Sequence, residues 1–269
     1  MAKTCYLNQH FIPCSEAGIN LSDLGLLRSY GVFDFFRTYN GHPFLLDDHL
    51  GHFRESAEIL GIDLTFSDDH IRRVVKKLID KNEWRDGGIR MVLTGGEESN
   101  FFIIPEELPV FSEQDYQKGV AVKTYSYQRP YPRAKTLNYL IPWTLRQKSF
   151  FKDITEIIYT DKGKILEGSQ SNLFVIKEGN LITPKENVFH GATRNLVLEL
   201  AAEDFNVEER DLLKEEVKEV EEVFITSTTK EILPVTKWND REIGSGEVGP
   251  QTKKIRDLFR SYLKKSINN

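Results

Sequence analysis

The sequence has little of what marks several common classes of protein. Its 269 residues include only two cysteines, Cys5 and Cys14, too few for a disulfide framework and without the spacing of a metal site. No uninterrupted apolar run approaches the roughly 18–20 residues of a membrane-spanning helix. We find neither an internal repeat nor a low-complexity segment. We therefore expect a protein without a bound metal or a membrane partner, and a reducing cytoplasm is its simplest location.

An excess of basic charge is also missing. The chain carries 36 basic and 41 acidic residues, a formal net charge of −5, and no basic patch dominates. Nucleic acid is therefore not an expected partner. Hydrophobic residues make up 39% and charged residues 29%, which is typical of a soluble globular chain. The length suits two domains.

The patterns in the first half predict strands followed by helices. A Val- and Phe-rich segment at 31–38 precedes Asn40-Gly41, a dipeptide typical of hairpin turns. Asp47 or Asp48 offers an N-cap for one helix, and Ser67 offers the N-cap for a second helix with an apolar stripe. Further strands are expected at 4–11, 88–93 and 101–104. This region predicts an α+β architecture.

A Pro-punctuated stretch, 129–133, interrupts this pattern. We place a linker at 128–134, between a small N-terminal α/β domain (1–127) and a larger C-terminal domain (135–269). The acidic run 215–222 is expected to form a solvated helix face. In the C-terminal domain we expect helices at 144–151, 193–202 and 251–264, and strands at 156–160, 172–176, 181–183 and 223–226.

Two segments point to chemistry. Lys135 stands in Ala-Lys-Thr-Leu-Asn-Tyr, and Glu167 follows it by 32 positions in Leu-Glu-Gly-Ser-Gln-Ser-Asn-Leu-Phe. Together they resemble the core motif of the class IV (fold type IV) pyridoxal-phosphate enzymes. That family includes D-amino-acid transaminases, branched-chain aminotransferases and aminodeoxychorismate lyases. The resemblance runs from Gly31 to Val235 and implies a larger domain with a β-barrel-like core and flanking helices.

The resemblance assigns roles to both residues. Lys135 would hold pyridoxal 5′-phosphate as a Schiff base and would act as the general base, which requires a site where its amine can lose a proton. Glu167 would bind the pyridine nitrogen and keep it protonated, so that the ring can accept electrons after the α-proton is removed. Tyr139, near the lysine, is a candidate partner of the cofactor's phenolic oxygen. The alternative is that Tyr139 is a core aromatic.

The cofactor's phosphate needs hydrogen-bond donors, which helix N-termini supply. His-Gly-Ala-Thr-Arg at 190–194 resembles the family's phosphate loop, with Ala192 and Thr193 as donors. Thr228 and Thr229 belong to a second Ser/Thr cluster that resembles the family's other phosphate loop. One position departs from the family, because His52 stands where an arginine commonly binds the phosphate. We therefore expect weaker cofactor retention than is usual in the family.

A transaminase must also hold the substrate's α-carboxylate, for which arginine is the natural partner. Arg90 lies in a predicted strand, and Arg28 lies in a segment that reaches the neighbouring subunit's pocket in related enzymes. The carboxylate trap of bacillar D-amino-acid transaminases is absent, since Phe33 and Thr94-Gly95-Gly96 stand at its positions. Arg28 and Arg90 are the predicted replacements, and Arg28 would act across a homodimer.

These features favour an atypical D-amino-acid transaminase that acts on D-alanine or D-glutamate with 2-oxoglutarate or pyruvate. Three alternatives stay open. A branched-chain L-amino-acid aminotransferase would use the same cofactor but need an apolar pocket, which a buried guanidinium at Arg28 disfavours. An aminodeoxychorismate lyase would share Lys135 and Glu167 but eliminate pyruvate. A non-catalytic binding module would retain the fold alone.

Overall fold

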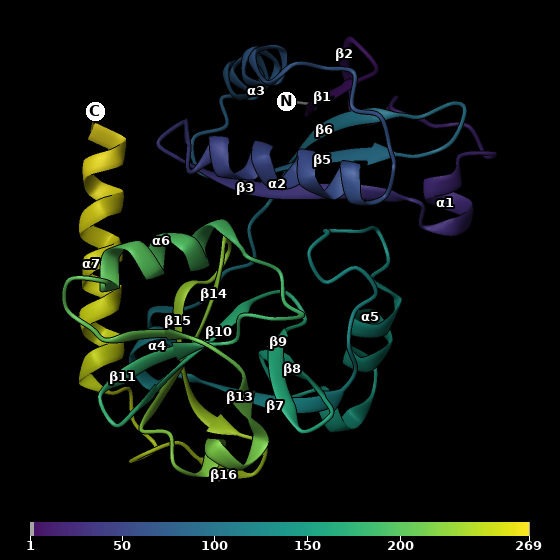
Figure 1. Cartoon of the computed structure of the whole chain (residues 1–269). Helices are drawn as coiled ribbons and strands as arrows, with labels where there is room; N and C mark the ends of the chain where they lie inside the picture. Colours follow the sequence, from purple (N-terminus) through teal and green to yellow (C-terminus); the bar gives the residue numbers. More distant parts are fainter. Residues whose placement is uncertain (1–2, 269) are drawn as a thin grey trace. The chain divides into compact units, whose positions relative to one another are not determined.

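A computed structural model describes residues 3–268 as two compact units, each of which is described by itself (Figure 1). The first unit comprises the chain up to Pro109 together with Ala134–Tyr139. The second unit comprises Val110–Arg133 and the chain from Leu140 onward. Among the described residues, no helix combines the length and apolar character needed to cross a bilayer.

This division differs from the expected one, which began the second domain at residue 135. The segment 134–139 belongs to the first unit because it continues the hydrogen bonding of a strand there. The Phe33 N–H donates to the Lys135 carbonyl (2.9 Å), and the Leu137 N–H donates to the Gly31 carbonyl (3.0 Å). Lys135 is therefore fixed to the first unit by backbone bonds rather than by a position after a linker.

The first unit is built on an antiparallel six-stranded sheet in the order β2-β1-β6-β5-β3-β4. Helices α2 and α3 bury their apolar stripes against the sheet in one core cluster. The strands are β1 (Thr4–Leu7), β2 (His10–Pro13), β3 (Gly31–Tyr39), β4 (His42–Pro43), β5 (Gly87–Thr94) and β6 (Phe101–Glu106). The helices are α1 (Leu24–Arg28), α2 (Leu46–Ile59) and α3 (Asp68–Asn82).

Some local signals of this half act as expected, and two do not: the strand expected at 4–11 is the hairpin of β1 and β2, and neither Asp47 nor Asp48 caps α2. Asn40 and Gly41 both have positive φ (54° and 83°) and join β3 to β4, which confirms the predicted turn. Ser67 caps α3 by accepting a hydrogen bond from the His70 N–H. Helix α2 begins one residue before the expected Asp47, after a left-handed Leu45 and without a side-chain cap.

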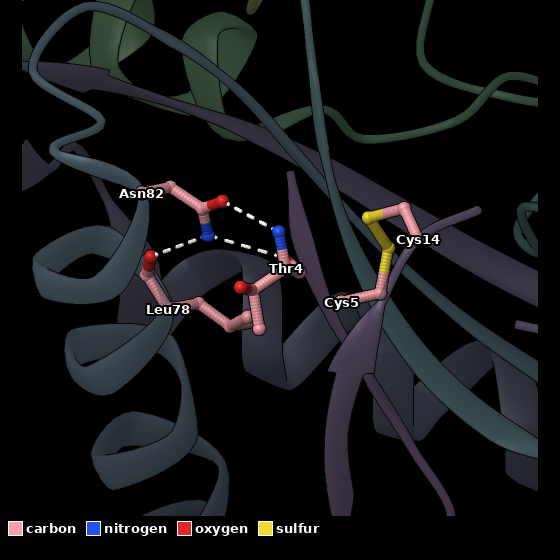
Figure 2. Close-up of a disulfide and its surroundings, with 5 residues drawn as sticks. All are labelled: Thr4, Cys5, Cys14, Leu78 and Asn82. Atoms are coloured by element: carbon pink, nitrogen blue, oxygen red, sulfur yellow. Dashed lines mark hydrogen bonds between the residues drawn. A yellow bond between two sulfur atoms is a disulfide. The ribbon is translucent and has the colours of Figure 1, made fainter. Parts of the chain in front are cut away.

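The two cysteines are joined in a disulfide (Figure 2), a bond that the sequence analysis did not expect. Strands β1 and β2 pair so that Cys5 lies opposite Ile12, and the Cα atoms of Cys5 and Cys14 are 5.0 Å apart. Asn82, at the end of α3, holds the start of β1 through both backbone groups of Thr4 (2.7 and 3.1 Å). Hairpin pairing, which sequence spacing does not show, brings the thiols together.

The second unit contains a ten-stranded sheet that curls into a half-barrel. Its order is β12-β11-β10-β14-β15-β7-β8-β9-β13, with β16 paired to β15. The pairs β11–β12, β15–β7 and β7–β8 are parallel. The strands are β7 (Val120–Ser126), β8 (Glu156–Asp161), β9 (Lys164–Gly168), β10 (Asn172–Lys177), β11 (Asn180–Thr183), β12 (Val207–Glu209), β13 (Leu212–Leu213), β14 (Glu222–Ser227), β15 (Glu231–Trp238) and β16 (Arg241–Glu242).

Helices α6 and α7 pack together and against strand β14. The helices are α4 (Glu113–Lys118), α5 (Leu140–Arg146), α6 (Ala192–Ala201) and α7 (Pro250–Asn268), with 3-10 turns η1 (Ser149–Phe151) and η2 (Lys214–Lys218). The helix expected at 144–151 therefore begins and ends earlier, and its last residues form η1.

The expectation of a solvated helix for the acidic run 215–222 is confirmed only at its start, where Glu215 and Lys218 are exposed on a short 3-10 helix. The run forms the short turn η2 and then enters β14 at Glu222, which is buried. The Glu222 carboxylate accepts hydrogen bonds from the Gln251 and Thr252 N–H groups (3.0 and 2.7 Å). These donors lie in the first turn of α7, where a carboxylate satisfies free N–H groups and the helix dipole.

Candidate active site

Lys135 is the first predicted site residue, and its surroundings differ from an apolar pocket. Its N–H donates to Ser56 Oγ (3.1 Å), so α2 and β3 together fix its backbone. Its Nζ lies 3.2 Å from Asp34 Oδ2, and its side chain is 20% exposed. The side chain is thus partly exposed while its amine faces a carboxylate on β3.

Asp34 is fully buried and ionised. Burial by itself would raise the pKa of this carboxyl, but the charges of Lys135 and then His49, with a hydrogen bond from His49, lower the pKa to about 2. His49 Nδ1 lies 2.6 Å from Asp34 Oδ1. His49 itself is only 3% exposed on α2. Hydrogen bonds from His49 and the Phe35 N–H hold Oδ1, whereas Oδ2, which has no hydrogen bond among the described residues, faces Lys135 as an ion-pair partner, so Oδ1 fixes the orientation of the carboxylate.

His52 and Tyr139 lie in the same unit as Lys135. His52 is half-buried one helical turn after His49, and its charge acts on Asp34. The Tyr139 ring packs edge-on against Phe33, with centroids 5.4 Å apart. The first unit therefore brings His52 close to the Asp34 carboxylate that faces Lys135.

Glu167 belongs to the second unit and is paired with an arginine that the sequence analysis did not assign. Arg129 donates to Glu167 Oε1 through Nε and Nη2 (both 2.7 Å). The Phe189 N–H donates to Oε2 (2.9 Å). Burial raises the pKa of Glu167, and Arg129 opposes that rise. Because carboxylate oxygens accept several hydrogen bonds, a further donor can still bind.

The two phosphate-loop candidates connect to the segment of Glu167. Asn172 accepts from the Gly191 N–H (3.2 Å) and donates to the Phe189 carbonyl (2.5 Å), so it holds the start of α6 beside the residue that binds Glu167. Helix α6 has no side-chain N-cap, and Ala192 and Thr193 form its first turn. Its first N–H groups are therefore suited to an anion.

The loop of Thr228 and Thr229 connects through a buried ion pair. Lys230, which follows them, lies 3.2 Å from Glu156 Oε2. Glu156 also accepts from the hydroxyls of Ser169 and Ser171 (2.6 and 2.9 Å), in the turn after Glu167. Burial alone would raise the pKa of Glu156, but Lys230 and these donors lower it. The second unit thus brings together the three predicted segments that contain Glu167, Thr193 and Thr228.

The two arginines predicted to bind the substrate are in different situations. Arg90, on β5, forms a two-point ion pair with Glu106 (2.5 and 2.8 Å) and lies over the ring of Phe33, 5.0 Å from its centroid. Arg28 ends the short helix α1, is exposed, and donates to the adjacent Leu27 carbonyl. Arg90 is therefore held in place within its unit, whereas Arg28 projects from its own.

Packing and backbone conformation explain why glycines stand at positions 95 and 96, where bacillar D-amino-acid transaminases carry their carboxylate trap. A Cβ added to Gly95 would lie 2.3 Å from the Tyr30 ring, and Gly96 has a φ of +115°. Neither position accepts a larger side chain without rearrangement. An Arg-x-His pair therefore does not fit this turn as it stands.

Sequence reasoning missed Arg129, Asp34 and Glu156. Arg129 was interpreted only as part of a Pro-rich linker, although a charged residue between buried elements is a usable signal. Asp34 is a lone carboxylate within the apolar run Val-Phe-Asp-Phe-Phe, a pattern that indicates a paired buried charge. Glu156 begins a buried strand and carries the same signal.

The comparisons with known proteins identify the family. Residues 31–238 match the family described as Amino-transferase class IV. The chain belongs to the class IV aminotransferases. It is 34% identical to a D-alanine aminotransferase of Bacillus licheniformis over 95% of each chain. It is also 32% identical to a putative branched-chain-amino-acid aminotransferase of Methanocaldococcus jannaschii, over 97% of this chain and 96% of that protein.

The fold agrees. The branched-chain amino acid aminotransferase of Escherichia coli superposes with a TM-score of 0.90 at 26% identity, over 97% of this chain and 94% of that one. The prediction of a fold type IV α+β enzyme is confirmed. Pyridoxal 5′-phosphate is the cofactor of this aminotransferase family, as expected from the motifs. The relatives include both D-alanine and branched-chain enzymes, so membership alone does not fix the substrate.

Proposed function

We propose that this aminotransferase is a D-amino-acid transaminase that moves the amino group of D-alanine or D-glutamate to a 2-oxo acid such as 2-oxoglutarate or pyruvate. The observation that carries transamination is the partly exposed side chain of Lys135, held by backbone bonds with its amine against ionised Asp34. The D-specific proposal is supported by the 34% identity to a D-alanine aminotransferase.

Each unit, taken by itself, holds residues whose chemistry suits pyridoxal 5′-phosphate. Lys135 would hold it covalently, and the buried Glu167 would face the pyridine nitrogen. The uncapped first turn of α6, with Ala192 and Thr193, and the hydroxyls of Thr228 and Thr229 would bind the phosphate, as would His52. When bound, the cofactor supplies an electron-accepting ring.

This chain's own residues move the proton and keep the charges in place. Lys135 Nζ would take the α-proton of the substrate and later return it to a carbon of the cofactor. Arg129 opposes the rise that burial causes in the pKa of Glu167, and the ionised carboxylate would favour a protonated pyridine. Tyr139 would donate a hydrogen bond to the phenolic oxygen of the cofactor.

The substrate carboxylate would bind Arg90 and, from a second subunit, Arg28. Glu106 uses Nε and Nη2 of Arg90, which leaves donors of the five-donor guanidinium for a second carboxylate. The exposure of Arg28 on α1 suits a contribution across a homodimer. We further propose a cytoplasmic location. In that reducing compartment the Cys5–Cys14 bond would be open, so thiol titration of protein taken from the cell interior should find both cysteines free.

A branched-chain L-amino-acid aminotransferase is the second candidate. The observations that favour it are the 32% identity to a putative enzyme of that class and the apolar rings of Phe33 and Phe35 around Arg90. These rings would suit an apolar side chain. An aminodeoxychorismate lyase would release pyruvate without a 2-oxo acid.

The test is a steady-state assay on cofactor-loaded protein. We expect pyruvate from D-alanine beyond one equivalent per site only when 2-oxoglutarate is present, and little turnover of L-leucine. The variant R90M should raise the KM for D-alanine by about 10–100-fold, the usual effect of losing a hydrogen bond to a charged group. The exposed Arg73 provides the control variant R73M. Turnover of L-leucine alone, or repeated turnover of D-alanine to pyruvate without the acceptor, would reject the proposal.

A further inference from the structure

We propose that Asp34 is a positioning residue for Lys135: it holds the ammonium group that forms when the lysine takes a proton, and His49 in turn fixes Asp34. The inference rests on the proposed function, because it concerns the same lysine. All three residues lie in the first unit, so the argument needs no other part of the chain.

The geometry places a buried anion beside the amine. Asp34 Oδ2 is 3.2 Å from Lys135 Nζ, and Asp34 Oδ1 is 2.6 Å from His49 Nδ1. Asp34 has no exposed surface, and it pairs with Met91 in the middle of the β3–β5 ladder. A carboxylate in such a place is costly unless its partners are fixed. Its retention therefore calls for a specific role.

The surrounding backbone keeps the pair in register. The Phe33 N–H donates to the Lys135 carbonyl, and Ser56 Oγ accepts from the Lys135 N–H. Ser56 is itself fixed on α2, because its hydroxyl donates to the His52 carbonyl (2.7 Å). The backbones of Lys135 and Asp34 thus cannot separate without breaking bonds to β3 and α2, which keeps the amine within reach of the carboxylate.

A metal ion is the other ligand that this cluster suggests. The ligand atoms of Asp34, His49 and His52 lie within 4.8 Å of one another. However, the ammonium of Lys135 already lies against Asp34 as its cation. A divalent ion would have to displace this charge or share the carboxylate with it. The arrangement therefore favours the lysine over a metal.

The proposed role follows from the proton balance. During the half-reaction the Cα–H bond breaks, and its proton moves to Lys135 Nζ, which becomes an ammonium. Asp34 stays ionised and stabilises this charge at short range, and the proton then leaves Nζ for the cofactor carbon. A neutral side chain at position 34 would leave the ammonium with less compensation. The step that takes the α-proton should then slow.

The experiment compares D34N, D34E and H49L with the wild-type holoenzyme in a single-turnover half-reaction with D-alanine. Borohydride trapping of the cofactor on Lys135 is measured in parallel. We expect D34N to retain trapping but to react about 100-fold more slowly, within the usual range for acid–base assistance. The KM should change little, and the isotope effect with α-deuterated D-alanine should increase. D34E should recover part of the rate.

If D34N does not fold, variants of His49 and a control variant still test the inference. H49L removes the donor to Asp34 and should slow the half-reaction about 10-fold, while H49Q, which retains a donor, should be faster than H49L. D68N breaks the ion pair with Arg54 elsewhere in the same unit and should leave the rate unchanged. Equal rates in wild type, D34N and H49L would overturn the inference. Failure of the wild type to trap the cofactor on Lys135 would instead overturn the proposed function.

Discussion

The ion pair between Arg129 and Glu167 offers the sharpest test of the second unit. In the variant R129M, Glu167 stays buried but loses the cation that opposes the rise in its pKa. The pKa of this carboxyl should then rise further, because burial is the largest cause acting on it and its nearest cation is gone. A protonated Glu167 would also no longer favour a protonated pyridine nitrogen.

The burial of the ion pair sets the loss of stability that we expect in R129M. The side chains of Arg129 and Glu167 are 15% and 6% exposed. Breaking a buried pair by removing one partner costs about 3–5 kcal/mol. Because Arg129 keeps some contact with water and Glu167 can take up a proton, we expect the low end, about 3 kcal/mol. For a unit of this size that corresponds to a fall in Tm of roughly 6–12 °C.

The assay is thermal unfolding of R129M, followed by circular dichroism at pH 7. The exposed Arg73 again provides a matched control, and R73M should unfold within about 1–2 °C of wild type. The double variant R129M/E167Q should recover part of the loss, since it removes both charges. If R129M unfolds at the wild-type temperature, the pair does not stabilise the site and our reasoning is refuted.

Three further predictions concern other parts of the chain. The pKa of Asp34 in the folded protein is about 2, below its ordinary 3.8. The ionised carboxylate therefore contributes stability above pH 3.8, and this contribution is lost as the pH falls through 2. In urea titrations, the difference in unfolding free energy between wild type and D34N should shrink over that range. The variant H52R should bind pyridoxal phosphate about 10-fold more tightly by fluorescence titration, because it adds a permanent charge with paired donors; unchanged affinity would mean that position 52 does not touch the phosphate. A reductant should lower stability by roughly 2–3 kcal/mol, since Cys5–Cys14 closes a short loop; C5S/C14S should show no response to it.

The parts of the fold that sequence predicts are those fixed by local rules. The Asn40-Gly41 turn, the Ser67 cap and the apolar stripe of α3 depend on residues close in sequence, and each forms as expected. The boundary was misplaced because 134–139 pairs with β3, about a hundred residues earlier in the chain. The buried start of β14 was missed for a similar reason, because Glu222 binds the first turn of α7. The disulfide was missed because residues 4–11 were expected to form one strand, whereas the chain turns after Leu7 and forms the hairpin of β1 and β2.

The same distinction between local and long-range signals applies to the site residues. Lys135 and Glu167 were recognised because a motif carries them at a fixed spacing. Arg129 and Asp34 were not recognised from the sequence because strand pairing and packing determine their partners. Asp34 and Lys135 are about a hundred residues apart in sequence, so the sequence does not predict that Asp34 Oδ2 lies 3.2 Å from Lys135 Nζ. The roles of Arg28 and Arg90 stay predictions, because the first needs a second subunit.

The central claim is tested most directly by a single-turnover measurement on the cofactor-loaded protein. D-glutamate, D-alanine and L-leucine are added separately, without an acceptor, and the visible absorption of the bound cofactor is followed. Our account predicts that this absorption is lost with both D-amino acids and retained with L-leucine. Loss with L-leucine alone would contradict it, because the enzyme would then belong with the branched-chain group and the assignment of the carboxylate to Arg28 and Arg90 would be wrong.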